Sequence, residues 1–320
     1  MTSILRQLQN EWNALVPVAQ ERGFRRVRIL QNRLERISHR REKLEWLRAQ
    51  LNSSTAFDTL TFGVELECIL PAGFTHSTIA RLITEAGVGC NAEQYNHTAR
   101  AAWKVVADGS LGDYSRGCEI VSPPMSGEEG FAQIRKVCAV LVANRVRITK
   151  KCGFHVHVGI ASESLTTLKN LVRTYSGSDA VINGLVSPSR RHNPYCGAIR
   201  INHAAVDAAN DMDSLVRAIG QIPGERYVRS SSRYAKVNLQ SYYQHRTVEF
   251  RQHQGTVEGA KVENWVRLCL RMVVASRAAN AASQDLSTLL ATLNASDTER
   301  QYFTQRAAQF AQAAPYRRAA

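Results

Sequence analysis

Three short segments of this sequence alternate between apolar and ionisable residues. Successive side chains of a β-strand point to opposite faces of the sheet, so each segment predicts a strand with one apolar face and one ionisable face. Helices must then cover the apolar face, while the ionisable face stays open for chemistry. The ionisable residues are Glu65 and Glu67 in the first segment, His155 and His157 in the second, and Glu249, Arg251 and His253 in the third.

The three ionisable faces together resemble a metal and phosphate site. If the strands share one sheet, three carboxylates, three imidazoles and one guanidinium meet on one surface. Carboxylate oxygens suit Mg²⁺ or Mn²⁺, imidazole broadens the choice toward Mn²⁺, and arginine offers a two-pronged donor for phosphate. Taken singly, the same residues also fit a solvated sheet face, partnered core histidines or a surface ion pair. Their combination favours a functional site.

A fourth segment adds another carboxylate. Trp103–Ala107 and Glu119–Val121 predict two strands around an Asp-Gly turn at Asp108-Gly109, with Glu119 opening the return strand. By itself this pattern is equally compatible with a simple hairpin.

The remaining periodicity predicts an α+β fold with a mainly antiparallel sheet and flanking helices. A further strand is expected over 236–240, paired with 247–252. Strands and helices do not alternate regularly, which excludes a βαβ architecture. Helices are predicted over 77–87, 127–144, 163–186, 259–281 and 285–312.

Residues 1–55 form a predicted basic, amphipathic helical extension. Residues 2–51 carry eleven Arg and Lys residues against five Glu residues, and apolar residues recur there at steps of three and four. This segment fits a nucleic-acid contact through residues 1–50, a tether, a homo-oligomer interface, or a helix packed on the core. We expect a catalytic domain over 56–285 and a C-terminal helical segment over 286–320.

Composition limits the class of protein. With 320 residues, 44% of them apolar, the chain can bury a sizeable core. Its net charge of +14 and pI of about 9.8 suit polyanions such as nucleotides or nucleic acid. Seven scattered cysteines without a CxxC pair argue against a disulfide framework or a zinc ribbon, and favour a cytoplasmic protein. No apolar run is long enough for a membrane span, so no membrane association is expected.

Several nucleotide and hydrolase motifs are absent. The sequence contains no GxxxxGK[ST] P-loop, no HExxH and no GxSxG. If ATP binds, metal ions and basic side chains must hold it.

Seven ordered motifs within about residues 58–280 resemble the amidoligase family, which belongs to the carboxylate–amine ligase superfamily of glutamine synthetase and glutamate–cysteine ligase. The resemblance implies a glutamine-synthetase-like catalytic sheet. It also implies a ligase that uses ATP and Mg²⁺ (or Mn²⁺) to form an amide bond through an acyl phosphate. The motifs are FGVELE (62–67), WKVVADGSL (103–111), GCEIVSPP (117–124), CGFHVHVG (152–159), SRRHNPYC (189–196), RYAKVNL (233–239) and TVEFRQHQGT (247–256).

The resemblance also implies roles for individual residues. His157 and Arg251 correspond to phosphate contacts, and Arg191 and Arg246 resemble further phosphate or carboxylate clamps. Asn193, Tyr195 and Cys196 match a family motif without an assigned role. The implied metal ligands are Glu65, Glu67, Glu119, His155 and Glu249.

Other parts of the mechanism rest on chemistry. Asp108, at a turn near Glu119, is our candidate for the base that deprotonates the amine, with Arg246 and Arg251 stabilising the transferred phosphoryl group. Cys196 is either a thioester-forming nucleophile or, as we favour, a buried structural residue. The substrates, an amine and a carboxylic acid, are open among small molecules, peptides and modified nucleic acid. The familiar motifs for ammonium and glutamate are not evident.

Two rival functions use the same residues differently. A metal-dependent hydrolase or nuclease would employ the Glu and His side chains without ATP. A non-catalytic nucleic-acid-binding protein would instead rely on the basic N-terminal segment.

Overall fold

The computed structural model describes residues 59–94, 96, 98–113, 115–224 and 231–311. The predicted basic extension lies outside the described residues, as do residues 56–58 and 312–320. Among the helices of the described ranges, none is both long and apolar enough to cross a membrane.

A seven-stranded sheet in the order β2-β3-β4-β1-β5-β7-β6 forms the centre of the described chain. Every neighbouring pair is antiparallel except β2 and β3. This confirms the α+β class and the mainly antiparallel sheet, although the parallel edge strand β2 was not predicted. The strands are β1 Phe62–Ile69, β2 Cys90–Glu93, β3 Trp103–Ala107, β4 Gly117–Val121, β5 Gly153–Gly159, β6 Val237–Asn238 and β7 Thr247–Gln254.

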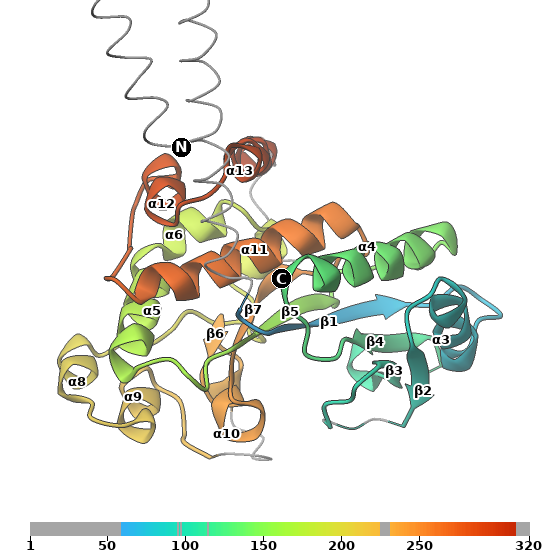
Figure 1. The fold of residues 1–320 in the computed structure, drawn as a ribbon, viewed down its shortest axis with the longest axis horizontal. Coiled ribbons are helices and arrows are strands. Elements are labelled where there is room, and N and C mark those ends of the chain that lie inside the picture. The colour runs from blue at the N-terminus through green and yellow to red at the C-terminus, as the bar shows by residue number, and fades with distance from the viewer. Residues whose placement is uncertain (1–58, 95, 97, 114, 225–230, 312–320) are drawn as a thin grey trace, which may run out of the picture. The chain divides into compact units, whose positions relative to one another are not determined.

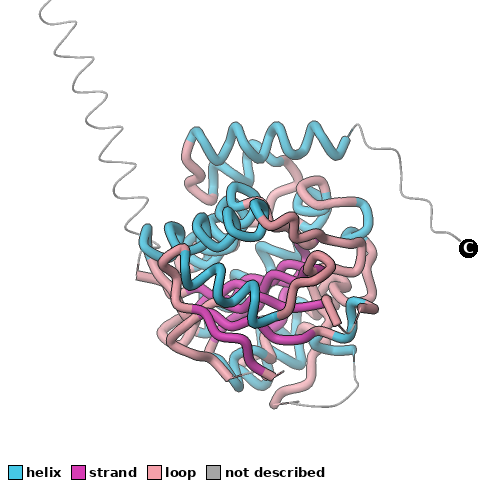
Figure 2. Tube along the Cα trace, turned by 90° about the vertical axis from the view of Figure 1, so that its right-hand side faces the viewer, coloured by secondary structure: helices cyan, strands magenta, loops and turns pink. Residues whose placement is uncertain are grey.

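Long helices cover one face of this sheet, as Figures 1 and 2 show. They are α4 Gly127–Ala143, α5 Leu165–Gly177 and α11 Gly259–Ser276, while α3 His76–Glu85 packs on β2 and β3. Phe62 of β1 stacks on Phe131 of α4 with ring centroids 5.0 Å apart. The apolar residues of the alternating strands are fully buried here, as the pattern predicts: they include Val64, Leu66, Val156, Val158, Val248 and Phe250.

The remaining elements complete the described chain. They are α6 Asp179–Asn183, α7 Pro188–Arg191, α8 His203–Ala208, α9 Met212–Ala218, α10 Ser241–His245, α12 Leu286–Thr292, α13 Asp297–Ala311 and the 3₁₀ turns η1 Gly109–Leu111 and η2 Ser231–Arg233.

Three predicted elements differ in detail. The helix predicted over 163–186 is divided between α5 and α6 at the buried Ser178, and the helix over 285–312 is divided near Asn294, whose φ of 52° is left-handed. The tight Asp108-Gly109 turn is instead η1 followed by a loop. The Asp108 carboxylate accepts the backbone N–H of Ser110 and thereby caps η1.

A β-bulge in β7 overturns the predicted position of His253. Phe250 pairs with Val156, but His253 pairs with Phe154, so β7 contains one extra residue between these pairs. The extra residue reverses the alternation. His253 therefore faces the helices, where its ring lies 4.9 Å from that of Trp265.

We expect His253 to make folding stability depend on pH. Burial lowers its pKa from 6.5 to about 3, so between these values the unfolded chain binds a proton that the folded chain does not. The neutral ring therefore makes its full contribution to the free energy of unfolding above the unfolded pKa of 6.5. This contribution falls as the pH drops, by about 2 kcal/mol between pH 7.5 and pH 5. Denaturant unfolding at both pH values should show a smaller loss for His253→Phe. The exposed control His203→Gln should keep the wild-type loss, and equal losses in His253→Phe and wild type would contradict the assignment.

The ion pair of a buried lysine with a half-buried aspartate supplies a second test. Lys236 is only 1% exposed, and its Nζ donates to Asp179 Oδ1 at 2.6 Å and to Asn183 Oδ1 at 2.8 Å. Asp179→Asn should lower the free energy of unfolding by about 3 kcal/mol, because it leaves the buried ammonium without its counter-charge. Asp207→Asn is the matched control. It breaks a pair with Arg173 in which the aspartate side chain is 74% exposed, so it should cost under about 1 kcal/mol. Similar losses in both variants would show that burial does not decide the effect.

Candidate active site

Strand register brings the predicted carboxylates and imidazoles together on the sheet face opposite the long helices. Glu67 pairs with Glu119 across β1 and β4, and Glu65 pairs with His155 across β1 and β5. His157 in turn pairs with Glu249 across β5 and β7. Four adjacent strands therefore contribute to one surface, as the alternation predicted.

Two overlapping groups of side chains on this surface have the spacing of metal ligands. The first is Glu65, His157 and Glu249; the second is Glu65, Glu119 and His155. Within each group, one candidate ligand atom per residue lies within 4.8 Å of the others. Glu65 belongs to both groups, so it would bridge two neighbouring cations.

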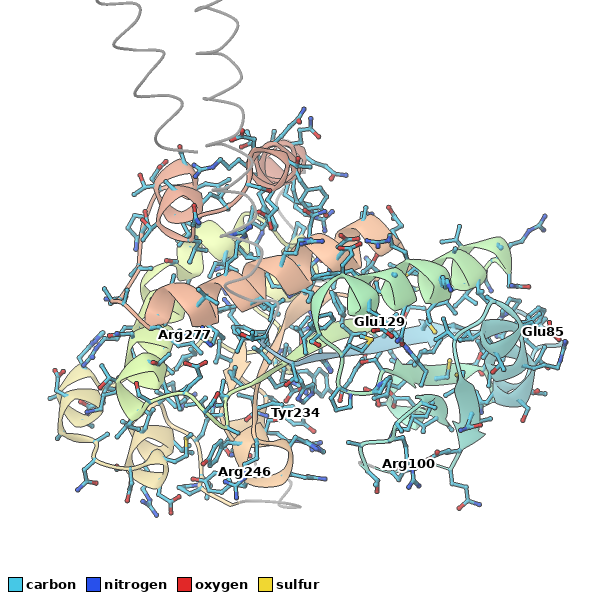
Figure 3. All side chains as sticks on the ribbon, viewed as in Figure 1. Glu85, Arg100, Glu129, Tyr234, Arg246 and Arg277 are labelled. Atoms are coloured by element: carbon cyan, nitrogen blue, oxygen red, sulfur yellow. The ribbon has the colours of Figure 1, made fainter. Side chains whose placement is uncertain are left out.

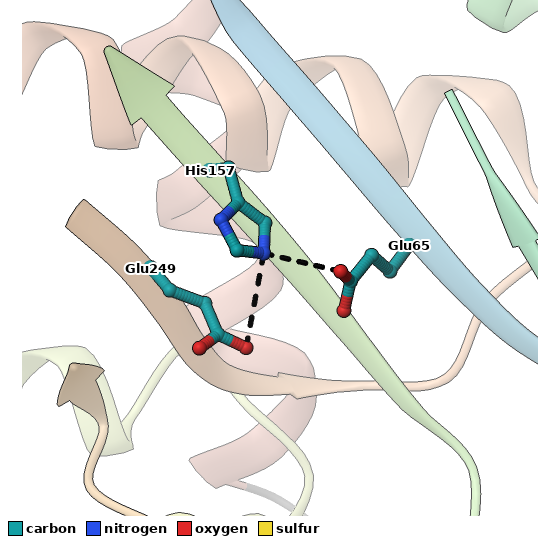
Figure 4. A group of neighbouring side chains, drawn as sticks. All are labelled: Glu65, His157 and Glu249. Carbon is teal, nitrogen blue, oxygen red and sulfur yellow. Dashed lines mark ion pairs between the residues drawn. The ribbon is translucent and has the colours of Figure 1, made fainter. Parts of the chain in front are cut away.

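His157 has the environment of a metal-binding imidazole. Its ring projects from β5 between Glu65 and Glu249, as Figure 4 shows, with Nε2 at 3.2 Å and 3.9 Å from their carboxylate oxygens. Nδ1 lies 3.1 Å from Ser241 Oγ and 3.0 Å from Thr247 Oγ1, whereas the buried Nε2 has no hydrogen-bond partner among the described residues. Hydroxyl contacts at Nδ1 fix a ring whose other nitrogen faces two carboxylates, and this arrangement fits a divalent cation.

The charges of the group point the same way. Burial raises the pKa of Glu119 well above its usual range, and the neighbouring charges of Glu65 and Glu67 raise it further. Burial also acts to raise the pKa of Glu65, but the charge of His157 and the hydrogen bond from His155 outweigh it and hold that pKa well below the usual range. The surface thus has more carboxylate than its imidazoles neutralise, and a cation would favour ionised Glu119.

Hydrogen bonds orient the outer carboxylate oxygens. Glu67 Oε2 accepts the backbone N–H of Gly153 at 2.6 Å, and Glu249 Oε2 accepts Asn238 Nδ2 at 2.7 Å. Such bonds fix how a carboxylate is presented to a metal. Asn238 was not predicted to take part, because the two-residue β6 is too short to show a period.

Arg251 lies at the edge of the same surface and forms an ion pair with Glu249. Burial opposes the charge of Arg251, but Glu249 and Glu65 outweigh it and raise the pKa of the guanidinium. In return, although burial acts to raise the pKa of Glu249, Arg251 and His157 hold it below its usual value. A fixed cation is therefore available beside the proposed ligands.

The other predicted arginines lie elsewhere. Arg191 Nη2 points to the carbonyl of Phe310 in α13 at 3.5 Å. Arg246 is exposed, and its guanidinium lies over the Tyr242 ring at 4.6 Å beside α10 (Figure 3).

Arg190, which was not predicted, lies close to the carboxylates and imidazoles of this surface. It is buried, and Nη2 donates to the Arg251 carbonyl at 2.7 Å. A Cβ placed on Gly153 would lie 3.2 Å from Arg190 Nη2, 3.0 Å from His155 Nε2 and 3.5 Å from Glu67 Oε2. These three groups therefore converge on Gly153. In the sequence, two adjacent arginines offered no means of choosing between them.

Two cavities adjoin the metal-ligand surface and share Glu65, His157, Gln244 and His245 as lining residues. The smaller, of about 110 Å³, also contains Arg233, Arg251, Asn238 and Glu249. The larger, of about 280 Å³, has an apolar portion that includes Phe62, Ala99, Val121 and Pro124, and it reaches Glu119 and Lys104. The small cavity thus combines two carboxylates with two guanidinium groups, whereas the larger one is more apolar.

Comparison with family models agrees with the resemblance seen in the sequence. No curated protein matches the chain. Among 35 matching chains of solved structures is one described as the crystal structure of a novel glutamine synthase homolog. It has 10% sequence identity and a TM-score of 0.34 over 82% of this chain and 68% of that one. The family described as "Putative amidoligase enzyme" matches residues 58–273, which is more than half of the chain. The chain therefore belongs to this amidoligase family.

Proposed function

We propose that this protein is an ATP-dependent carboxylate–amine ligase with a glutamine-synthetase-like catalytic sheet. The observation that carries the proposal is the pair of overlapping Glu and His groups beside Arg251, in a chain of the amidoligase family. Carboxylate and imidazole ligands next to a guanidinium suit a metal–triphosphate complex.

Each group would hold one divalent cation. Glu65, His157 and Glu249 would bind one ion, and Glu65, Glu119 and His155 the other, with Glu67 beside His155. Mg²⁺ or Mn²⁺ bound there would supply charge neutralisation for the phosphates.

The larger cavity is the proposed nucleoside site. Its volume of about 280 Å³ and its apolar portion suit a purine ring, and it borders Glu65, Glu119 and His157, where the phosphates must lie. The smaller cavity, with Arg233 and Arg251, remains for the carboxylic acid.

The proposed reaction has two steps. The γ-phosphoryl group passes from ATP to a carboxylate oxygen, giving ADP and an acyl phosphate. The amine nitrogen then attacks the acyl carbon, loses a proton and expels inorganic phosphate, leaving an amide. Arg251 would stabilise the negative charge on the transferred group. Asp108 stays our proposed base: its charge acts on Glu119, although its carboxylate also caps η1.

Metal binding gives the sharpest test of the ligand assignment. Calorimetric titration with Mn²⁺ should show two sites in the wild type. Glu119→Gln and Glu249→Gln should each weaken one site by about 10- to 100-fold, because each residue belongs to one group. Glu65→Gln should weaken both. Two unchanged sites in Glu65→Gln would exclude the shared-ligand arrangement, and the exposed Glu85→Gln on α3 serves as the control.

Activity tests the reaction class. With Mg²⁺, ATP, a mixture of carboxylic acids and hydroxylamine as the amine, the protein should release ADP and phosphate only when an acid is present. Arg251→Ala should lower kcat by at least about 100-fold, and Arg251→Lys should not restore it, because an ammonium lacks the two-pronged geometry. Turnover that ignores ATP and cleaves phosphodiesters would instead identify a metal-dependent hydrolase. Full activity in Arg251→Ala would remove this arginine from the mechanism.

A further inference from the structure

A turn over residues 192–197 follows α7 and is held by several hydrogen bonds, and the proposed reaction does not explain it. Asn193 forms an isolated bridge with Cys196, its Oδ1 accepts the Tyr195 N–H at 2.9 Å, and its Nδ2 donates to the Ser189 carbonyl at 3.2 Å. Cys196 is fully buried, with its thiol 3.6 Å from the Arg190 carbonyl. Burial raises the pKa of this thiol, which makes it a poor nucleophile and a suitable anchor.

The turn holds one large aromatic side chain in solvent. Tyr195 is 60% exposed, although Asn193 is held by hydrogen bonds and Cys196 is buried. Its ring and that of Tyr234 are T-shaped, with centroids 5.4 Å apart. The Tyr195 carbonyl lies 3.5 Å from Arg251 Nε. Tyr234 is labelled beside β6 and β7 in Figure 3. An exposed aromatic ring on a fixed turn is a typical contact for a ligand, since little rotamer freedom is left to lose.

Two guanidinium groups join this aromatic pair to the cavity. Arg233 and Arg251 lie 5.0 Å and 5.7 Å from the centre of the Tyr234 ring, and both line the small cavity. On the side of the cavity toward Tyr234, the lining thus consists of two guanidinium groups, and the Tyr234 and Tyr195 rings follow beyond them. A ligand that matches this order has a carboxylate at its end and a planar group immediately behind it.

The size of the cavity shows how much of the ligand can enter. At about 110 Å³ it lies well below the roughly 300 Å³ at which pockets enclose a whole small molecule. A cavity of this size takes only the terminal carboxyl group of an acid and its nearest atoms, beside the lining residues Arg233 and Arg251. The rest of the acid must lie outside, across Tyr195.

We propose that the acid substrate is a peptide whose terminal carboxylate enters the small cavity while the preceding planar amide lies on Tyr195. This inference rests on the proposed ligase function. Tyr195 is then a specificity-determining residue: it selects an extended acid over a free amino acid, and the Asn193–Cys196 turn holds it in position.

The test compares acids of two lengths. A library of tripeptides and a mixture of the free amino acids are each offered with ATP, Mg²⁺ and hydroxylamine, and hydroxamate is measured. Tripeptides should react at least about tenfold faster. Tyr195→Ala should raise their KM about tenfold with little change in kcat, as the loss of one stacking contact requires. Tyr195→Phe should keep the wild-type KM, because the ring and not the hydroxyl makes the contact.

Two further variants separate position from packing. Asn193→Ala removes the side-chain hydrogen bonds of the turn but keeps the Tyr195 ring, and it should also raise KM. Val142→Ala, which shortens a 53% exposed side chain on α4, should change neither parameter. Equal rates with free amino acids, or a loss of kcat instead of KM in Tyr195→Ala, would each overturn the proposal.

Equilibrium dialysis of the tripeptide library without turnover separates this inference from the proposed function. Binding that Tyr195→Ala weakens, in a protein that releases no ADP with any acid, would count against the ligase and leave the peptide contact standing. Binding that the variant leaves unchanged would overturn the contact even in an active ligase.

Discussion

The repulsion between carboxylates that share one sheet face is the constraint on which the rest of this structure depends. Glu67 and Glu119 are direct cross-strand partners, and Glu65 follows on the same face of β1. Like charges directly opposite each other destabilise a sheet, and partial burial adds to that cost. The neighbouring strands offset it with His155, His157 and Arg251. Burial and the charges of Glu65 and Glu67 still raise the pKa of Glu119, so these cationic partners do not remove the repulsion completely.

The carboxylates can share one face of the sheet because the opposite face of the same strands is an ordinary apolar core. The apolar residues of the same strands are buried under α4, α5 and α11, which fixes the register of each strand. Register in turn decides which carboxylate meets which imidazole. The sheet therefore fixes the backbone positions of the site. The surrounding groups, such as Asn238 and the hydroxyls at His157, then orient its side chains.

The parts of the site that alternation could predict are those on strands long enough to show it. Glu65, Glu67, His155, His157 and Glu249 lie where the period of two places them. The sequence could not show the bulge that sends His253 to the core, because one extra residue leaves no local signature. Nor could it choose Arg190 over Arg191: the orientation of the four-residue α7 depends on backbone carbonyls of β7, which are distant in the sequence.

The bulge in β7 also has a consequence for how this strand can vary. Before the bulge, Glu249 and Arg251 face the candidate active site, and after it His253 faces Trp265. The single added residue therefore lets one strand supply side chains to both faces of the sheet. An insertion or deletion at the bulge would turn the residues on one side of it to the opposite face, so that either the ionisable side chains or His253 would change faces. The length of this stretch is therefore as constrained as the identity of Glu249 and Arg251 within it.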